Sequence, residues 1–589
     1  MAATLQITID GAAAEPLRFA AAELQRYLAA ITGSAAEVRS AQLSGQLLVL
    51  GPLPERVPEP PADADGFVIE PTAAGAVISG ASPRAVLHGV YALLEQQGCR
   101  WSLHGRAHEV VPRLPALAPI RAVRVQPRFE VCGYSADIMT WHYADAAHLS
   151  EHLEADCEFI DWMGKSGANA YLLIRHPFDS QLTIPELVPE FNRRGIAAEY
   201  GGHVIPLLLP RELFARHPEY FPCAAGGARS EFGNLCTANA GALRLATENA
   251  VRYVREYPEL SVLHIWGADL WDGGWCHCAA CAGVTVQDQS LRLCNAVATA
   301  LAEQGEARPV CYLAYHDTIA PELQLRPAEN VYVEFAPRER CYAHALDDPC
   351  CAANRRYRRA LEGYAERFDG RVRFFEYYAD AILFCGCALP LGEVIAADLD
   401  YYHRLGIRQI TNLQFGAFSL WAYPLNFLAY AAAARSRRCD LAQVREQYAE
   451  GFSRQRDLAA AALRELETIM GPVVTYGDIR RPPLRPRAAA ALRPRLESAI
   501  QRLGRLAEAL APALEPGGEL VALQAQLRYN AAVLAGVGEQ LAGRDPRHAY
   551  ERALAIMENV ERRFKGLWGA ENLPVIHAYH DAAIAEARG

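Results

Sequence analysis

The N-terminal part of the chain alternates short apolar runs with longer stretches in which apolar residues recur every three or four positions. The short runs end at turn residues and predict strands at residues 5–9, 46–51, 66–71 and 75–80. The longer stretches predict helices at residues 16–33 and 82–98. We therefore expect a small α+β domain over residues 1–118, and a linker in the proline-rich stretch 110–129.

A regular alternation of apolar run, polar loop and amphipathic segment follows. Eight runs are candidate strands, at residues 128–137, 168–176, 196–204, 261–269, 310–317, 330–337, 372–380 and 407–415. Eight β–α units in this length predict an α/β fold with a central (β/α)8 TIM barrel over residues 128–425. The alternative is a doubly wound open sheet. It would be expected to carry a Gly-rich phosphate-binding turn, and the sequence contains neither GxGxxG nor GxxxxGK[ST].

The alternation ends near residue 425, where long segments rich in Ala, Leu, Arg and Glu begin. These segments have helical composition, at residues 424–439, 440–470, 494–514 and 553–567. We expect a helical C-terminal domain over residues 426–589 that packs on the barrel or pairs two subunits as a homodimer.

The ends of the candidate strands carry the residues expected to contact a substrate, because barrel enzymes act at the C-terminal ends of their strands. The polar candidates are Asp137, Arg175, His176, His203, Asp269, Asp272, His316, Asp317, Glu334, Arg338, Glu376, Asp380 and Gln414. Aromatic residues stand among them, namely Trp266, Trp271, Tyr315 and Tyr377. One acidic residue at a strand end is typical of a helix cap or a salt bridge. Carboxylates at four successive strand ends, amid aromatic rings, instead indicate a carbohydrate site.

The predicted reaction is the hydrolysis of a glycosidic bond. It needs one carboxyl group that protonates the leaving oxygen and another, ionised, that faces the developing positive charge on the sugar. We assign Asp269, after the fourth strand, as the acid and Glu376, in the seventh, as the nucleophile or stabiliser. Asp272 is the alternative acid. No organic cofactor is expected.

Two other functional classes compete with this hypothesis. One is a carbohydrate-binding barrel without chemistry, in which loss of the acidic groups would leave ligand binding intact. The other is a metal-dependent hydrolase or lyase that uses His176, His203 and His316. It ranks last, because these histidines lack HxH or HExxH spacing.

A second feature lies just after the fourth strand, in the segment WCHCAAC. Cys276, Cys278 and Cys281 can present three thiolates on one side of a tight turn, as in a structural zinc site. Cys236 is the candidate fourth ligand and His277 the local alternative. Such a zinc ion would fix the loop that carries the predicted acids. Free cysteines packed in a loop are the competing interpretation.

Composition and charge narrow the choice of partners and location. The chain has 589 residues, 51% of them apolar and 21% charged, as is typical of soluble globular proteins. A net charge of −10 argues against nucleic acid or an anionic membrane as a partner. The N-terminal segment lacks the pattern of a signal peptide, and the sixteen cysteines are spread along the chain. We therefore expect reduced cysteines and a cytoplasmic location.

Several segments together resemble the bacterial "domain of unknown function 4838" family, which lies near the glycoside-hydrolase barrels. The resemblance covers most of residues 1–450 and rests on residues 87–101, 216–223, 234–239, 275–281, 330–357, 373–380 and 398–410. The N-terminal domain is similar to the one that precedes the barrel in β-N-acetylhexosaminidases and α-glucuronidases. The resemblance implies a glycosidase but no particular substrate. The candidate substrates are an N-acetylhexosaminide and a glycoside that contains a uronic acid.

The sequence departs from the hexosaminidase pattern at the end of the fourth strand. The segment Trp266-Gly267-Ala268-Asp269 stands where that family has an adjacent Asp-Glu pair, which argues against a mechanism assisted by the substrate's acetamido group. Arg175, Arg338 and Arg340 could instead bind the carboxylate of a uronic acid, since a guanidinium group matches it with two hydrogen bonds.

Overall fold

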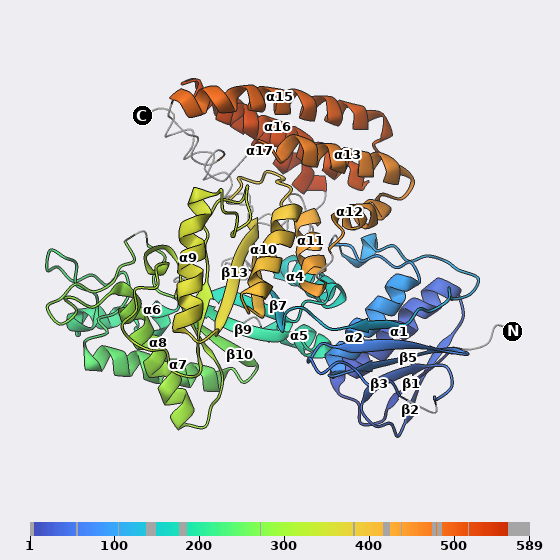
Figure 1. The fold of residues 1–589 in the computed structure, drawn as a ribbon, viewed down its shortest axis with the longest axis horizontal. Coiled ribbons are helices and arrows are strands. Elements are labelled where there is room, and N and C mark those ends of the chain that lie inside the picture. Colours follow the sequence, from blue (N-terminus) through green and yellow to red (C-terminus); the bar gives the residue numbers. More distant parts are fainter. Residues whose placement is uncertain are drawn as a thin grey trace.

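The computed structural model describes residues 5–563, except 55–56, 104, 137–148, 176–184, 271, 381–382, 416–423, 437–438, 474–478, 480–485 and 516–517. Figure 1 shows three parts: an N-terminal sheet domain, a central barrel and a layer of C-terminal helices. None of the described helices combines the length and the apolar character needed to cross a bilayer.

The N-terminal domain is a six-stranded mixed sheet in the order β2-β1-β3-β5-β4-β6. Its strands are β1 (Leu5–Asp10), β2 (Ala36–Ala41), β3 (Gln46–Leu50), β4 (Phe67–Thr72), β5 (Gly75–Gly80) and β6 (Val123–Val125). Helices α1 (Glu15–Thr32) and α2 (Pro83–Gln96) bury their apolar stripes with the sheet in one core. Strand β6 pairs with β4, so this sheet includes part of the stretch that the sequence assigned to a linker.

The central domain is the predicted barrel. Its strands form a closed ring in the order β7-β8-β9-β10-β11-β12-β13-β14, with every neighbouring pair parallel. The strands are β7 (Val131–Ala136), β8 (Ala170–Arg175), β9 (Ala197–Gly202), β10 (Leu260–Ile265), β11 (Val310–Ala314), β12 (Val331–Phe335), β13 (Val372–Asp380) and β14 (Gln409–Phe415). Each overlaps one of the predicted runs, which confirms the fold class.

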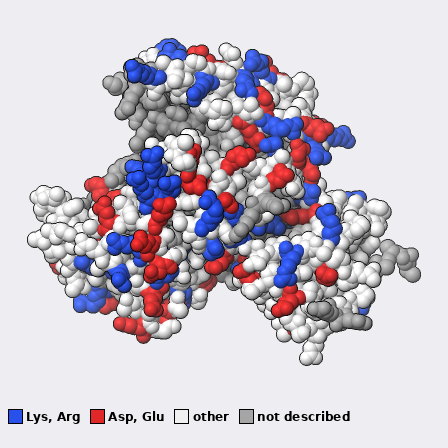
Figure 2. All heavy atoms as spheres, viewed as in Figure 1, with Lys and Arg blue, Asp and Glu red and all other residues white. Residues whose placement is uncertain are grey.

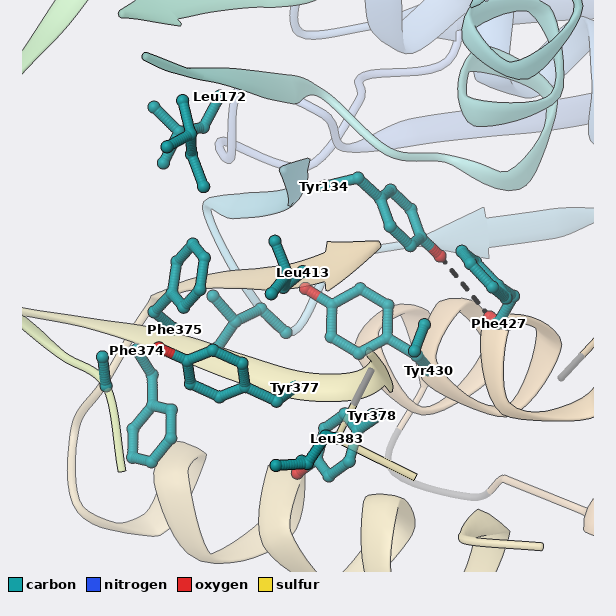
Figure 3. Packing of buried hydrophobic residues seen from close by; sticks show 14 of the residues in the cluster. Tyr134, Leu172, Phe374, Phe375, Tyr377, Tyr378, Leu383, Leu413, Phe427 and Tyr430 are labelled. Atoms are coloured by element: carbon teal, nitrogen blue, oxygen red, sulfur yellow. Dashed lines mark hydrogen bonds between the residues drawn. The ribbon is translucent and has the colours of Figure 1, made fainter. Parts of the chain in front are cut away.

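Helices surround the ring. They are α4 (Leu149–Ser166), α5 (Val188–Arg194), the short α6 (Ile205–Leu208), α7 (Ala240–Glu256), α8 (Val286–Glu303), α9 (Ala352–Arg367), α10 (Gly392–Arg404) and α11 (Pro424–Arg435). Figure 3 shows the packing between strands and helix α11, where the hydroxyl of Tyr134 donates to the carbonyl of Phe427. Aromatic rings fill much of this layer, as where Tyr134 stacks on Phe427 with ring centroids 5.7 Å apart.

The C-terminal helices pack on one another and on the barrel. They are α12 (Leu441–Ala449), α13 (Arg456–Met470), α15 (Pro486–Leu510), α16 (Glu519–Leu541) and α17 (Arg547–Arg563). Helix α16 reaches the loop that follows β13. The side chain of Asn530 accepts a hydrogen bond from the Ala388 amide at 3.0 Å and donates to its carbonyl at 3.1 Å. The hydroxyl of Tyr529 donates to the carbonyl of Cys385 at 2.6 Å.

Buried charges join the N-terminal domain to the barrel. The Lys165 ammonium of α4 pairs with Glu109, which follows the N-terminal domain's second helix in the chain, at 2.5 Å and also with Asp161. Asp161 further pairs with Arg106 at 2.7 Å and with Arg194 at 2.5 Å. Because removing a partner from such a cluster leaves a buried charge unpaired, these contacts fix how the two domains meet.

A second network of charges fills the inside of the barrel. The imidazole of His264 on β10 lies 2.8 Å from Glu334 on β12 and 3.0 Å from Glu199 on β9. Arg373 on β13 donates to both oxygens of Glu199 at 2.6 Å. Burial opposes charge on the Glu199 carboxyl, but Arg373 and His264 lower its pKa to about 2. Burial likewise opposes charge on His264, yet the carboxylate of Glu334 raises the pKa of the imidazole well above 6.5. The cations Arg373 and His264 therefore balance the anions Glu199 and Glu334.

Replacing Arg373 with methionine should destabilise the barrel by about 3–5 kcal/mol, because two buried carboxylates would then share one imidazolium. Urea denaturation followed by circular dichroism measures the loss. The matched control is Arg404→Met, whose exposed ion pairs with Asp347 and Asp400 should contribute no more than about 1 kcal/mol. Equal losses in the two variants would contradict the balanced network.

Candidate active site

The strands β9 to β13 deliver a group of polar side chains to one edge of the barrel. Because the strands are parallel, their C-terminal ends meet at this edge. The group, called the mouth cluster below, consists of His203, Asp269, Tyr315, His316, Arg338, Glu339 and Asp380. Six of these were predicted from the sequence. Glu339 was not, because it lies inside the loop after β12 rather than at a strand end.

His316 is the centre of the mouth cluster. Burial lowers the pKa of its imidazole, whereas the carboxylates of Asp269 and Glu339 act in the opposite direction, and the net shift is downward. Both carboxylates therefore lie near the ring, and the imidazole is neutral at pH 7. The residue has a backbone φ of 45°, in the left-handed region that few non-glycine residues adopt. Its ring lies against that of Tyr315, with centroids 3.7 Å apart.

Asp380, at the end of β13, is held by a cation and a backbone amide. Arg338 Nη2 lies 3.2 Å from one carboxylate oxygen, and the amide of Leu383 donates to the other at 2.9 Å. The guanidinium carbon of Arg338 lies 5.9 Å from the ring centroid of Tyr377. A cationic partner and a donated hydrogen bond both favour the ionised form of a carboxyl group. Asp380 is thus suited to face a positive charge that develops in a reaction.

Aromatic side chains form the floor beneath this group. Trp266 lies edge-on to the rings of His203 and Phe375, at centroid distances of 5.4 and 5.6 Å. Its indole N–H donates to Glu334 at 3.1 Å. Glu334 has no exposed surface, so the structure places this predicted substrate-binding residue under the floor, where it supports the tryptophan. The Nδ1 atom of His203 lies 2.6 Å from the carbonyl of Gly267, so that nitrogen is the donor.

The structure does not bring Glu376 to the mouth cluster. Phe374 and Phe375 extend to opposite sides of β13 (Figure 3), and Phe374 stacks on Tyr402 of α10 at 3.8 Å. Glu376 lies on the same outer side, where the Tyr402 hydroxyl donates to it at 2.5 Å and Arg340 pairs with it at 3.2 Å. Burial raises the pKa of the Glu376 carboxyl to about 7, although Arg340 opposes the shift. The carboxylate of Glu376 thus lies between the barrel wall and α10, away from the mouth cluster.

Arg340 is likewise an internal group. Besides Glu376, its guanidinium pairs with Asp398 of α10, and the Tyr378 hydroxyl donates to Asp398 at 2.8 Å. The amide of Leu346 donates to the same carboxylate at 2.6 Å. These buried contacts anchor the loop that carries Arg338 and Glu339. They also contradict the predicted contact between Arg340 and a substrate carboxylate.

Two further acidic candidates lie on the loop side of the mouth. The Oδ2 atom of Asp317 lies so close to Gly273 that a Cβ there would meet it at 2.0 Å. Burial raises the pKa of the Asp317 carboxyl, while a hydrogen bond from Trp275 lowers it and the nearby charge of Asp272 raises it. Asp272 itself is exposed. Asp317 therefore packs against the β10–α8 loop and holds it in place.

The side chains of five predicted substrate-binding residues lie outside the described part of the structure. Asp137, His176 and Trp271 lie outside the described residues. Arg175 and Gln414 are described by their backbones alone, at the C-terminal ends of β8 and β14. Both positions are at the same barrel edge as the mouth cluster.

The four predicted metal ligands do come together. The sulfur atoms of Cys236, Cys276, Cys278 and Cys281 all lie within 4.8 Å of one another. Cys236 precedes α7, which Asn239 caps, and the other three precede α8, which Thr285 caps. The cluster thus ties together the starts of two barrel helices.

Two cavities lie elsewhere in the described part of the molecule. One of about 340 Å³ lies between the barrel helices α10 and α11 and the C-terminal helices, and one of about 170 Å³ between the N-terminal domain and α11. No member of the mouth cluster lines either cavity. The larger is lined mainly by apolar side chains, among them Leu389, Leu425 and Leu463. It is also lined by Glu393 and Glu467, and the latter pairs with Arg445 at 2.5 Å.

Comparison with solved structures finds the same fold among carbohydrate-active enzymes. A GH115 4-O-methyl-α-glucuronidase, BtGH115A, specific for decorated arabinogalactans, matches with a TM-score of 0.61 and 12% identity, over 98% of this chain and 80% of that one. A GH138 enzyme targeting pectin rhamnogalacturonan II matches with a TM-score of 0.59 and 10% identity, over 95% of this chain and 91% of that one. At such identities the likeness establishes the fold.

Comparison with curated protein sequences finds no match. Comparison with family profiles finds one. Residues 168–423, which span the barrel from just before β8 to beyond β14, match the family described as "Domain of unknown function (DUF4838)". The resemblance expected from the sequence is therefore confirmed over residues 168–423, which match the DUF4838 family and belong to a barrel whose fold is shared with glycoside hydrolases.

Proposed function

We propose that the protein is a glycoside hydrolase that acts at the mouth of its barrel. The observation that carries the proposal is the convergence of Asp269, Glu339 and Asp380, from three different strands or their loops, on one group of histidine, arginine and aromatic side chains. Glycoside hydrolysis uses a pair of carboxyl groups, and aromatic rings beneath them can pack against the sugar. The likeness to two enzymes that act on complex carbohydrates supports the same class.

The roles follow from the surroundings of each carboxyl group. Asp269 is exposed beside the neutral His316 and is the proposed acid that protonates the leaving oxygen. Asp380 is buried and pairs with Arg338, and it is the proposed group that faces the positive charge developing at the anomeric carbon. This assignment keeps the predicted acid and replaces Glu376 by Asp380. Glu339 takes the place of Asp272 as the alternative acid, because Glu339 lies near the same imidazole whereas Asp272 lies near Asp317.

Arg338 is the remaining candidate for recognition of an acidic sugar. Its side chain is 17% exposed, and it is the one predicted arginine whose guanidinium the structure describes at the mouth. A uronic-acid glycoside is therefore the first substrate class to test, with N-acetylhexosaminides as the second. Assays with aryl glycosides of both classes show which substrate class is cleaved. The same assays with a chelator present test whether the histidines bind a metal ion that the reaction needs. Sugar binding without turnover would favour the binding-barrel alternative.

The role of Asp269 predicts a dependence on the leaving group. Loss of the acid should slow a substrate with a poorly acidic leaving group by about 10²–10⁴-fold, yet slow an activated nitrophenyl substrate much less. Steady-state rates of Asp269→Asn on the two substrates measure the difference. Asp272→Asn, on the same loop, is the control and should stay within about twofold of the wild type. The same dependence in Glu339→Gln, with none in Asp269→Asn, would move the role to Glu339.

The role of Asp380 predicts a loss that does not depend on the leaving group. Asp380→Asn should lower kcat/KM by about 10²–10⁴-fold on both kinds of substrate, because a neutral amide does not stabilise the oxocarbenium ion. Thermal unfolding of the same preparations shows whether the fold persists. Full activity in Asp380→Asn together with inactive Glu376→Gln would restore the original assignment.

The buried site of Glu376 predicts a change in stability with pH. A carboxyl whose pKa is higher in the folded than in the unfolded chain stabilises most below the unfolded value, and the contribution is lost as the pH rises through the folded value. Here those values are 4.5 and about 7. As the pH rises from 4.5 to about 7, the free energy of unfolding of the wild type should fall by about 2–3 kcal/mol more than that of Glu376→Gln. Urea titrations across this range test it, with the exposed Glu70→Gln as a control that should follow the wild type.

A further inference from the structure

Four cysteine sulfurs lie at the spacing of a tetrahedral metal site. The Sγ atom of Cys236 lies 3.7 Å from that of Cys278 and 3.8 Å from that of Cys281. A zinc ion bonds thiolate sulfur at about 2.3 Å, which places two sulfurs of a tetrahedron about 3.8 Å apart. A disulfide would need about 2.05 Å. The spacing therefore fits sulfurs that share an ion rather than a covalent bond.

The surroundings of the sulfurs also fit a site closed to solvent. Cys276, Cys236 and Cys281 are almost fully buried, and Cys278 partly so. The backbone amide of Cys223 lies 3.4 Å from the sulfur of Cys276, a donated hydrogen bond of the kind that stabilises a thiolate. Cys223 packs against the four cysteines, but its sulfur donates to the carbonyl of Ala224 at 3.5 Å and is not among the sulfurs that lie within 4.8 Å of one another. Four equivalent ligands leave no open position for a reaction.

We propose that Cys236, Cys276, Cys278 and Cys281 bind one structural Zn²⁺ ion. All four ligands are sulfur and their coordination shell is complete, which is the composition of structural and not of catalytic zinc sites. The ion does not take part in the reaction proposed at the mouth. The zinc site itself is independent of that reaction.

The ion's effect reaches the mouth through the loop between β10 and α8. Asn234, two residues before Cys236, receives a hydrogen bond from the amide of Ala268 at 2.8 Å and donates to the carbonyl of Gly273 at 2.5 Å. Its own amide donates to the carbonyl of Gly274 at 2.9 Å. Asp269 lies within the segment that these contacts hold. Zinc would therefore hold the segment of Asn234 and Cys236 and the end of the β10–α8 loop at Cys276, and so position the part of the loop that carries Asp269. The role of Asp269 as the acid rests on the proposed function.

A second group of potential ligands provides an internal comparison. Cys341, His344 and Cys351 also bring their ligand atoms within 4.8 Å of one another. This group has three members, and His344 is exposed. A structural zinc ion takes four ligands, so we expect zinc at the four-cysteine site alone.

The test measures metal in the full-length protein, purified under reducing conditions without chelator. Elemental analysis should find about one zinc per chain in the wild type. Cys276→Ser and Cys236→Ser should each lose it. Cys294→Ser, which removes a buried cysteine of α8 outside the site, and Cys351→Ser, in the second group, should both retain it. Less than a tenth of a zinc ion per chain in the wild type after incubation with ZnCl₂, or loss only in Cys351→Ser, would overturn the proposal.

A spectroscopic measurement covers variants that fail to fold. Zinc in the wild type is removed with a chelator and replaced by Co²⁺, and a tetrahedral four-thiolate site should then give an intense sulfur-to-cobalt absorption that added Zn²⁺ abolishes. The partly exposed Cys278→Ser should weaken and shift this band, whereas Cys294→Ser should leave it unchanged. Absence of the band in folded wild type would refute the site. Neither measurement needs turnover, so failure of the proposed glycosidase activity would leave the zinc result intact.

Discussion

Closure of eight parallel strands into one ring is the constraint on which the rest of the molecule depends. The last strand, β14, pairs with the first, β7, and because all eight strands are parallel their C-terminal ends form one closed rim. Residues far apart in the chain, such as Asp269 and Asp380, meet there only because the ring is closed. The ring also encloses a small interior, part of which is occupied by a network of four charged side chains where apolar side chains would be usual.

The interior charges and the mouth share a residue, and that links stability to function. Glu334 accepts from His264 inside the barrel and from Trp266 at the floor. The position of Trp266 in the floor thus depends on the same charged groups, Glu334 and His264, that stabilise the interior. In the same way Arg340, buried against Asp398 and Glu376, fixes the loop of Arg338 and Glu339 from behind. The buried Trp266 and the partly buried Arg338 and Glu339 at the mouth are thus held by charged groups that lie behind them.

The order of elements could be predicted from the sequence more fully than the direction of individual side chains. All eight barrel strands were found, because each is an apolar run closed by polar residues. Strands β2 and β6 were missed, since β2 has no buried residue and the three residues of β6 lie in a proline-rich stretch without a period. Glu376 was misplaced for a different reason. Every residue of β13 is buried, so alternation along the strand does not reveal which face lines the barrel. Only the contacts with Tyr402 and Arg340 do so.

The C-terminal helices belong to the frame of the site as well as to the exterior. Figure 2 shows acidic and basic side chains interspersed over the visible face, these helices included, so charge does not mark them as a binding surface there. Their contacts do define a role. Asn530 and Tyr529 of α16 hold the loop after β13 at Ala388 and Cys385, a few residues beyond Asp380. Because the β10 loop is fixed by Asn234 and the four cysteines, the two proposed catalytic carboxylates are positioned by different parts of the chain. Movement of the loop after β10 or of the loop after β13 would change the distance between Asp269 and Asp380, and the distance between two catalytic carboxyl groups decides the mechanism of glycoside cleavage.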